Sequence, residues 1–144
     1  MLFRSFLRMK IKWYQAKVVH GERRGKQLGF PTLNLDNPHL LKGSKEGVYA
    51  AKVIIEDKIY GGLIYFGPRL IWSETENVLE IFVLDFDREI YGKTISFQVI
   101  KYLRGVINFP NSQAFKGQLN LDIAKAKEHL EGDRMGSFRV KEMI

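Results

Sequence analysis

Residues 47–66 read Gly-Val-Tyr-Ala-Ala-Lys-Val-Ile-Ile-Glu-Asp-Lys-Ile-Tyr-Gly-Gly-Leu-Ile-Tyr-Phe. Two runs rich in Val, Ile and Tyr, at 47–56 and 59–66, flank the polar triplet Glu56-Asp57-Lys58. Branched and aromatic side chains favour strands, and a short polar connection between two such runs is typical of a tight hairpin. The stretch therefore predicts two antiparallel strands, and the fold class depends on what surrounds them.

Strand-like runs of the same kind lie on both sides of this hairpin, at 14–20, 78–86 and 94–102. The segment 87–93, with Tyr91-Gly92 near its end, resembles a second hairpin connection. No helical pattern separates the runs. Successive short strands without intervening helices predict a mainly β fold, a small antiparallel six-stranded barrel of Greek-key type.

The pattern changes after Pro110. Apolar residues then recur with the period of one helical face, at Phe115, Leu119, Ile123, Ala126 and Leu130. Asn111 or Ser112 can cap the start of this helix, and Gly132 suits its end. We expect the helix to pack on the barrel and to cover one of its openings. The predicted organisation is a basic tail over 1–12, the barrel with its helix over 13–131, and a second tail over 132–144.

Composition excludes several classes of protein. A chain of 144 residues is about the size of one domain, and it contains no cysteine. Disulfides, zinc thiolates and thiol nucleophiles are therefore excluded. Charges interrupt every apolar stretch, so we expect a cytoplasmic protein without a membrane span, by default a monomer. The net charge of +7 attracts phosphates, whether in nucleotides, in nucleic acid or on an acidic surface.

The segment 21–34 carries three glycines and three cations before it reaches Phe30-Pro31-Thr32-Leu33-Asn34. Glycine allows backbone N–H groups to turn toward an anion, so one interpretation is a phosphate-binding loop. The other is an exposed basic connection between strands. Pro31 favours an extended backbone, which would project Thr32 and Asn34 to the same side. Their two neutral oxygens suit Mg²⁺ together with nucleotide phosphates and water, although both residues also cap turns commonly.

Glu80 is a lone carboxylate on one face of the apolar run 78–86. That face also holds Val78, Phe82, Leu84 and Phe86. If the face points inward, the carboxylate is partly desolvated and becomes a usable proton acceptor. If it points to water at the end of a strand, Glu80 has no such role.

Together these features resemble the riboflavin kinase (flavokinase) family. Members of that family have a small β-barrel with a Gly- and Arg-rich loop running into Pro-Thr-x-Asn, then Gly-Val-Tyr, then a strand with Glu ahead of Asp-Phe. The matching residues here are 28–34, Gly47-Val48-Tyr49, Glu80 with Asp85-Phe86, Tyr91-Gly92, Leu103-Arg104 and Asn108-Phe109. The resemblance extends from about Ala16 to Leu130 and keeps the order of the motifs.

The resemblance implies ATP-dependent phosphorylation of the ribityl 5′-hydroxyl of riboflavin, which yields FMN and ADP. Glu80 would accept the hydroxyl proton, and Thr32 and Asn34 would organise Mg²⁺. The residues that would bind the ATP phosphates are Gly21, Arg24, Gly25, Lys26, Gly29 and Pro31. The residues that would form a flap over the flavin are Arg104, Asn108 and Phe109.

The chain departs from the family pattern at two places. Ala16 replaces a usual Gly, and Leu70-Ile71-Trp72 replaces a Pro-Thr-Phe that bacterial members usually carry. The adenylyltransferase domain fused to many bacterial members has no counterpart here, so formation of FAD is not expected.

Two alternatives belong to other functional classes. A basic barrel could bind nucleic acid through aromatic residues such as Trp13, Tyr14, Tyr60 and Trp72. A flavin or nucleotide binder could keep the fold without turnover. A nucleic-acid module would have no use for Thr32, Asn34 and Glu80 at these positions, which makes nucleic acid the less favoured partner.

Overall fold

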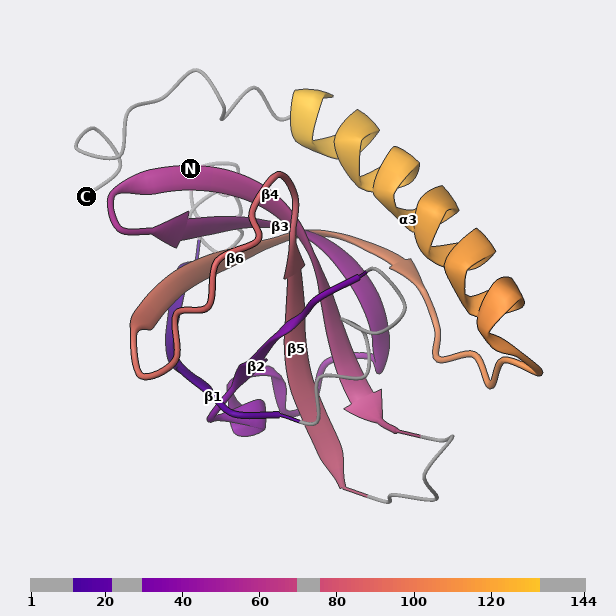
Figure 1. Cartoon of the computed structure of the whole chain (residues 1–144), viewed down its shortest axis with the longest axis horizontal. Coiled ribbons are helices and arrows are strands. Elements are labelled where there is room, and N and C mark those ends of the chain that lie inside the picture. The colour runs from indigo at the N-terminus through magenta and orange to yellow at the C-terminus, as the bar shows by residue number, and fades with distance from the viewer. Residues whose placement is uncertain (1–11, 22–29, 70–75, 133–144) are drawn as a thin grey trace, which may run out of the picture.

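Six antiparallel strands close into a barrel, and one long helix lies against its wall (Figure 1). The computed structural model describes residues 12–21, 30–69 and 76–132. The strands are β1 (Tyr14–Val19), β2 (Leu33–Leu35), β3 (Gly47–Ile55), β4 (Lys58–Pro68), β5 (Asn77–Val83) and β6 (Thr94–Arg104), in the spatial order β1-β2-β5-β4-β3-β6. The two predicted tails fall almost wholly outside the described residues.

The hairpin that the sequence predicts is present between β3 and β4. Its turn consists of Glu56 and Asp57, whose φ angles of 49° and 68° are both positive, as a two-residue turn of type I′ requires. Strands β3, β4 and β5 follow one another as neighbours, and β6 returns to pair with β3. This arrangement is a Greek key, so the predicted six-stranded barrel is confirmed.

Two local predictions are wrong. Strand β5 ends at Val83 instead of Phe86, because the chain turns at Asp85 with a φ of 58°. The segment 87–93 is not a hairpin, since β5 and β6 are not neighbours in the barrel. It crosses to β1, where Gly92 N–H donates to Val18 O (2.8 Å) and Val18 N–H donates to Lys93 O (2.9 Å).

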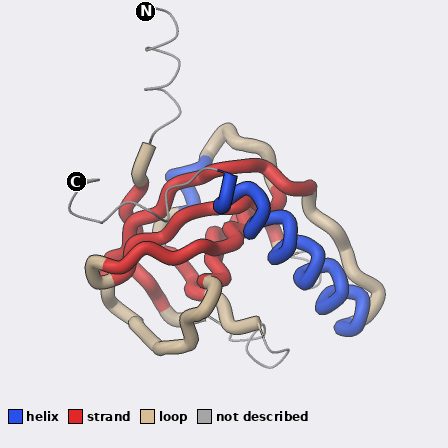
Figure 2. Tube along the Cα trace, turned by 90° about the horizontal axis from the view of Figure 1, so that it is seen from above, coloured by secondary structure: helices blue, strands red, loops and turns tan. Residues whose placement is uncertain are grey.

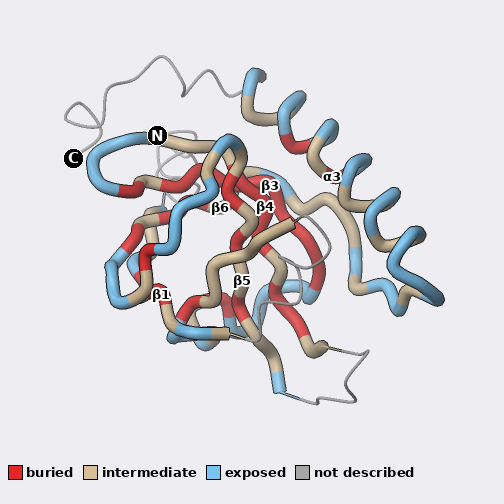
Figure 3. Tube along the Cα trace, viewed as in Figure 1, coloured by how far each residue is buried: buried red, intermediate tan, exposed pale blue. Residues whose placement is uncertain are grey.

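The barrel interior is filled by alternate residues of the strands. Figure 3 shows the buried residues in red, those of the interior together with those under the long helix. On β5 the inward residues are Leu79, Ile81 and Val83, all nearly inaccessible to solvent. The short 3₁₀ helix η1 (Pro38–Leu41) adds Leu41 to the same cluster. Since side chains alternate along a strand, Glu80 and Phe82 project from the outer face of the barrel.

Helix α3 (Ser112–Gly132) packs on the outer face of β3, β4 and β6, as seen from above in Figure 2. Ala126 lies in a second apolar cluster with the outward residues Val48, Ala50 and Leu63, and Leu119, Ile123 and Leu130 pack against it. The predicted apolar face is therefore confirmed. The helix does not cover an opening of the barrel, because the apolar surface it buries is on the wall. Within the described residues, no helix has the length and apolarity needed to cross a membrane.

Candidate active site

Asn34 and Glu80, which come from distant parts of the sequence, are direct partners on the neighbouring strands β2 and β5. Tyr65 of β4 pairs with Glu80 on its other side. Val48 of β3 pairs with Tyr65, and Arg104 of β6 pairs with Val48. Paired residues of antiparallel strands project to the same face of the sheet. These five residues therefore form one line across the outer wall, here called the outer row.

Arg69, directly after β4, binds the first two members of the outer row. Its guanidinium donates to Glu80 Oε1 from Nε (3.1 Å) and from Nη2 (2.5 Å). Nη2 also donates to Asn34 Oδ1 (2.9 Å). The side chains of Arg69 and Glu80 are only 22% and 19% exposed, so the ion pair is largely shielded from water. The partial burial of Glu80 comes from this covering and not from an inward orientation.

Arg69 belongs to none of the motifs that single out functional residues in the sequence. One signal was available, since a carboxylate in an otherwise apolar strand needs a nearby cation or donor. Strand β4 ends in Gly67-Pro68, with Arg69 next in the chain, and Gly67 pairs with Val78, two residues from Glu80. A hairpin register worked out for β4 and β5 would have placed Arg69 near the carboxylate.

Tyr65 secures the end of β4 from which Arg69 projects. Its phenol donates a hydrogen bond to the carbonyl oxygen of Pro68. Burial raises the pKa of the Tyr65 phenol to about 12, with further increases from the carboxylates of Glu80 and Glu46 that Arg104 and Arg69 partly offset. The phenol is thus a neutral hydrogen-bond donor at physiological pH.

The backbone of Gly21 lies against the amide of Asn34. A Cβ at position 21 would be 1.8 Å from Asn34 Nδ2, so only glycine leaves room for that side chain as it stands. Gly21 thereby connects the start of the predicted phosphate loop with the outer row. Pro31 and Thr32 are half-buried just before β2. Arg24, Gly25, Lys26 and Gly29 lie outside the described residues, as does the departure at 70–72.

The oxygens in this region suit a cation that is shared with a ligand. Among the described residues there is no group of three His, Cys, Asp or Glu side chains that could enclose a metal by itself. Asn34 Oδ1 and Glu80 Oε1 nevertheless converge on one cationic group, the Arg69 guanidinium. Amide and carboxylate oxygens are ligands that Mg²⁺ accepts, usually with substrate phosphates and water. The donor set therefore fits a magnesium–nucleotide complex better than an isolated metal ion.

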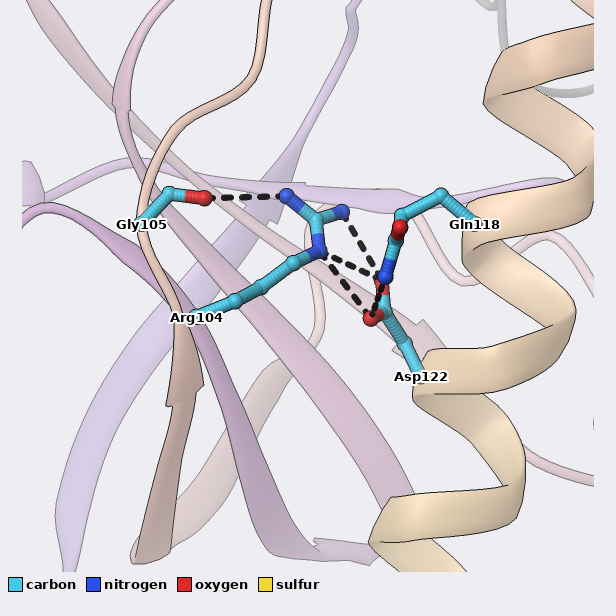
Figure 4. A network of polar contacts seen from close by, with 4 residues as sticks. All are labelled: Arg104, Gly105, Gln118 and Asp122. Carbon is cyan, nitrogen blue, oxygen red and sulfur yellow. Dashed lines mark hydrogen bonds and ion pairs between the residues drawn. The ribbon is translucent and has the colours of Figure 1, made fainter.

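At the other end of the outer row, Arg104 is held by helix α3 (Figure 4). Nε and Nη2 of Arg104 donate to the Asp122 carboxylate at 2.8–3.0 Å, and Nη1 donates to the carbonyl of Gly105. Gln118 Nε2 donates to the same carboxylate (3.0 Å). Asp122 is 1% exposed. The arginine predicted to belong to a flap thus joins β6 to the helix.

Phe109 belongs to a small aromatic group beside the start of α3. Its ring centroid is 5.4 Å from that of Phe115, edge to face, and 5.7 Å from the Arg104 guanidinium. Phe30, next to Pro31, contacts both Phe115 and Phe82 edge to face. Asn108 is exposed beside this group.

The aromatic residues considered for nucleic-acid binding are mostly engaged in packing. The Tyr14 ring stacks on Phe97, with centroids 5.1 Å apart, and Tyr60 contacts Phe86 edge to face. Trp13 is half-buried, and Trp72 lies outside the described residues. Tyr14, Tyr60 and Trp13 therefore offer little aromatic surface on which bases could stack.

Comparison with known proteins gives a family match and relatives that agree with one another. Residues 10–130 match the model of a family described as Flavokinase: Riboflavin kinase. A bifunctional riboflavin kinase/FMN adenylyltransferase of Haemophilus influenzae is 32% identical over 113 residues, which are 78% of this chain and 36% of that protein. An RNA-binding riboflavin kinase, RibR, of Bacillus subtilis is 31% identical over 115 residues, 79% of this chain and 49% of its own. The chain thus spans less than half the length of these relatives.

Solved structures show the same fold. The crystal structure of a riboflavin kinase from Trypanosoma brucei superimposes with a TM-score of 0.64 at 23% identity, over 88% of this chain and 84% of that one. A structure described as a macrolide-efflux protein from Streptococcus pneumoniae gives a TM-score of 0.67 at 27% identity, over 80% of this chain and 38% of that one.

Proposed function

The chain belongs to the riboflavin kinase family, and we propose on this basis that it transfers the γ-phosphoryl group of ATP to the ribityl 5′-hydroxyl of riboflavin. The products are FMN and ADP. The observation that carries the proposal is the pairing of Asn34 with Glu80. It sets an amide oxygen suited to a metal beside a carboxylate suited to a proton, and phosphoryl transfer needs little more than such positioning and charge neutralisation.

In this proposal Glu80 is the general base. The hydroxyl oxygen of riboflavin forms a bond to the γ-phosphorus, the bond between that phosphorus and the bridging oxygen of ADP breaks, and the hydroxyl proton passes to the Glu80 carboxylate. The position of Glu80 on the outer wall supports the role, because a substrate can reach a carboxylate there and could not reach one in the filled interior.

Thr32 and Asn34 would hold Mg²⁺ in company with the ATP phosphates. The bound ion would neutralise phosphate charge as the transferring group leaves ADP. We expect Thr32→Ala to raise the Mg²⁺ concentration needed for half-maximal activity, because one oxygen ligand is lost. A titration of initial rate against Mg²⁺ measures this, and an unchanged titration would leave Thr32 with only a turn-capping role.

The remaining predicted residues form two groups. Gly21, Arg24, Gly25, Lys26, Gly29 and Pro31 would bind the ATP phosphates, and the contact between Gly21 and Asn34 supports a loop that brings phosphate to the metal oxygen. Arg104, Asn108 and Phe109 would form the flap over the flavin. Phe109 and its aromatic neighbours suit a flat ring system. Because the Arg104 guanidinium is bound to Asp122, its contribution would be to fix the start of the flap.

The first experiment is to incubate the purified protein with riboflavin, ATP and Mg²⁺ and to separate the flavins by chromatography. A reaction without Mg²⁺ is the control, and other nucleoside triphosphates test the choice of donor. Magnesium-dependent FMN is the expected result. If no nucleoside triphosphate yields FMN, the proposal fails, and flavin fluorescence quenching and nucleic-acid binding then distinguish the two non-catalytic alternatives.

A further inference from the structure

The Arg69 guanidinium occupies a position that the proposed function assigns to Mg²⁺ and to the substrate hydroxyl. Its Nη2 is bonded at once to Asn34 Oδ1 and to Glu80 Oε1. This inference rests on the proposed function, in which Asn34 Oδ1 would hold Mg²⁺ and the Glu80 carboxylate would accept the substrate proton. A single guanidinium therefore contacts both halves of the proposed chemistry.

The arginine and a divalent cation cannot use these oxygens together. Both are positive, and at a separation of a few ångströms in a partly buried site their repulsion is weakly screened. Glu80 Oε1 already accepts two N–H donors, which leaves it little capacity for a further cation. An arginine at this position also has an alternative partner during turnover, because its planar donors bind phosphate in two-pronged fashion.

We propose that Arg69 is an internal counter-cation that holds Asn34 and Glu80 in position and that the magnesium–nucleotide complex must displace from them. Arg69 is thus a positioning residue both for the binding of the metal at Asn34 and for proton acceptance at Glu80. Tyr65 supports it, because the phenol binds the carbonyl of Pro68, the residue immediately before Arg69. In the absence of nucleotide the guanidinium would keep divalent cations off the site, so metal and nucleotide would bind together.

The test measures metal binding directly and does not depend on turnover. Free and bound Mn²⁺ are determined by electron paramagnetic resonance on the full chain without nucleotide, for the wild type, Arg69→Met and Arg88→Met. Arg88 is the matched control, because it also pairs with a glutamate, Glu56 (3.3 Å), but is 55% exposed and lies in the connection between β5 and β6, which contributes no member of the outer row. Both substitutions remove one positive charge.

The expected result is a dissociation constant for Mn²⁺ at least fivefold lower in Arg69→Met than in the wild type and in Arg88→Met. Arg69→Met/Glu80→Gln should lose this gain, because the negative charge beside the metal oxygen of Asn34 is gone. A smaller difference, or an equal gain in Arg88→Met, overturns the proposal. A variant that folds poorly would bind Mn²⁺ more weakly, which is the opposite sign, and Arg69→Lys with a thermal melt identifies that case.

Enzyme kinetics provide a second readout. Relative to wild type, Arg69→Met should lower the Mg²⁺ concentration at half-maximal rate while kcat falls, since Glu80 loses its orientation, and Arg69→Lys should recover part of kcat. If the wild type makes no FMN, the proposed function fails, but the Mn²⁺ comparison still decides whether Arg69 excludes cations from these oxygens.

Discussion

At the scale of single residues, the carboxylate of Glu80 is defined by its neighbours on the barrel wall. Asn34 and Tyr65 are its partners on either side, and Arg69 neutralises its charge. The group is accessible from outside yet largely shielded by the arginine.

We expect Glu80→Gln to retain binding of ADP and riboflavin but to lose most of its turnover. Glutamine keeps an oxygen that can accept from Arg69, so the local structure should survive. Loss of a general base typically costs about 10²–10⁴ in rate. Single-turnover formation of FMN measures the loss, and equilibrium binding of ADP controls for folding. Turnover near that of the wild type would remove Glu80 from the base role.

Gly21→Ala tests the close packing of loop and site. The added methyl group would overlap the Asn34 amide, so that side chain must rotate away from its present position. A forced rotamer costs about 1 kcal/mol, which corresponds to a rise of several fold in the Mg²⁺ needed for activity. The overlapping atoms belong to a flexible side chain, so thermal stability should change little.

The control for this substitution is Gly117→Ala. Gly117 lies within α3, and nothing is within 4 Å of a Cβ added there. Replacing a glycine by alanine inside an exposed helix stabilises it by about 1 kcal/mol. The control should therefore melt at a higher temperature with the same Mg²⁺ titration as the wild type. A Gly21→Ala variant with an unaltered titration would show that Asn34 has room elsewhere.

Residue roles were only partly predictable from the sequence. Glu80 could be singled out as a lone carboxylate in an apolar strand, and Asn34 by its place with Thr32 in the motif Pro31-Thr32-Leu33-Asn34. Their direct pairing could not be predicted, because β2 is three residues long and its register is set by closure of the barrel. Arg69 was not predicted because its two partners depend on two strand registers, that of β4 with β5 for Glu80 and that of β2 with β5 for Asn34.

At the scale of elements, the ion pair between Arg104 and Asp122 is the polar attachment of α3 to the barrel. Asp122 is buried under the helix, and Arg104 is 15% exposed. Three hydrogen bonds and the donation from Gln118 satisfy the carboxylate. The apolar cluster around Ala126 holds the rest of the helix.

We expect Asp122→Ala to destabilise the protein by about 3–5 kcal/mol, because a largely buried arginine is left without its counter-charge. Urea unfolding followed by circular dichroism gives the change in free energy. The matched control is Glu56→Ala, which removes the partner of the exposed Arg88 and should cost less than about 1 kcal/mol. Similar losses in the two variants would contradict a special role for the buried pair.

The bounds and the apolar face of helix α3 were predictable, because the helical period and the cap residue Asn111 are both local signals. In the structure Asn111 Oδ1 accepts a hydrogen bond from Ala114 N–H (2.8 Å).

The course of the connection 87–93 was not predictable from local signals. Its composition suits a hairpin, but β5 already has β2 and β4 as neighbours, so no hydrogen-bonding edge remains for β6. Long-range pairing overrode the local preference for a turn.

At the scale of the whole molecule, stability should depend on pH in the alkaline range. The pKa of Tyr65 is raised from 10.0 to about 12, so the folded protein holds this proton more tightly than the unfolded chain does. The stabilisation is complete below pH 10 and is lost as pH rises toward 12. Burial raises the pKa of Tyr49 as well, with a contribution from Tyr102, so it acts in the same direction.

Tyr65→Phe should therefore reduce the fall in unfolding free energy between pH 10 and 12. At neutral pH the variant should lose about 1 kcal/mol from the missing hydrogen bond to Pro68. Urea unfolding at pH 8, 10 and 11 measures both effects, and Tyr49→Phe should remove a further part of the slope. A slope equal to that of the wild type would mean that Tyr65 titrates alike in the folded and unfolded states.

Closure of the barrel also limits how this protein can associate. Every described strand has a hydrogen-bonded neighbour on each side, with β1 and β6 completing the circle. The strands thus offer little free edge to which a strand of another chain could be added. Strand addition at the barrel is limited to the edges of β1 and β5 beside the short β2, which pairs with only two residues of each, and a protein partner that binds elsewhere on the barrel must do so through side chains and loops.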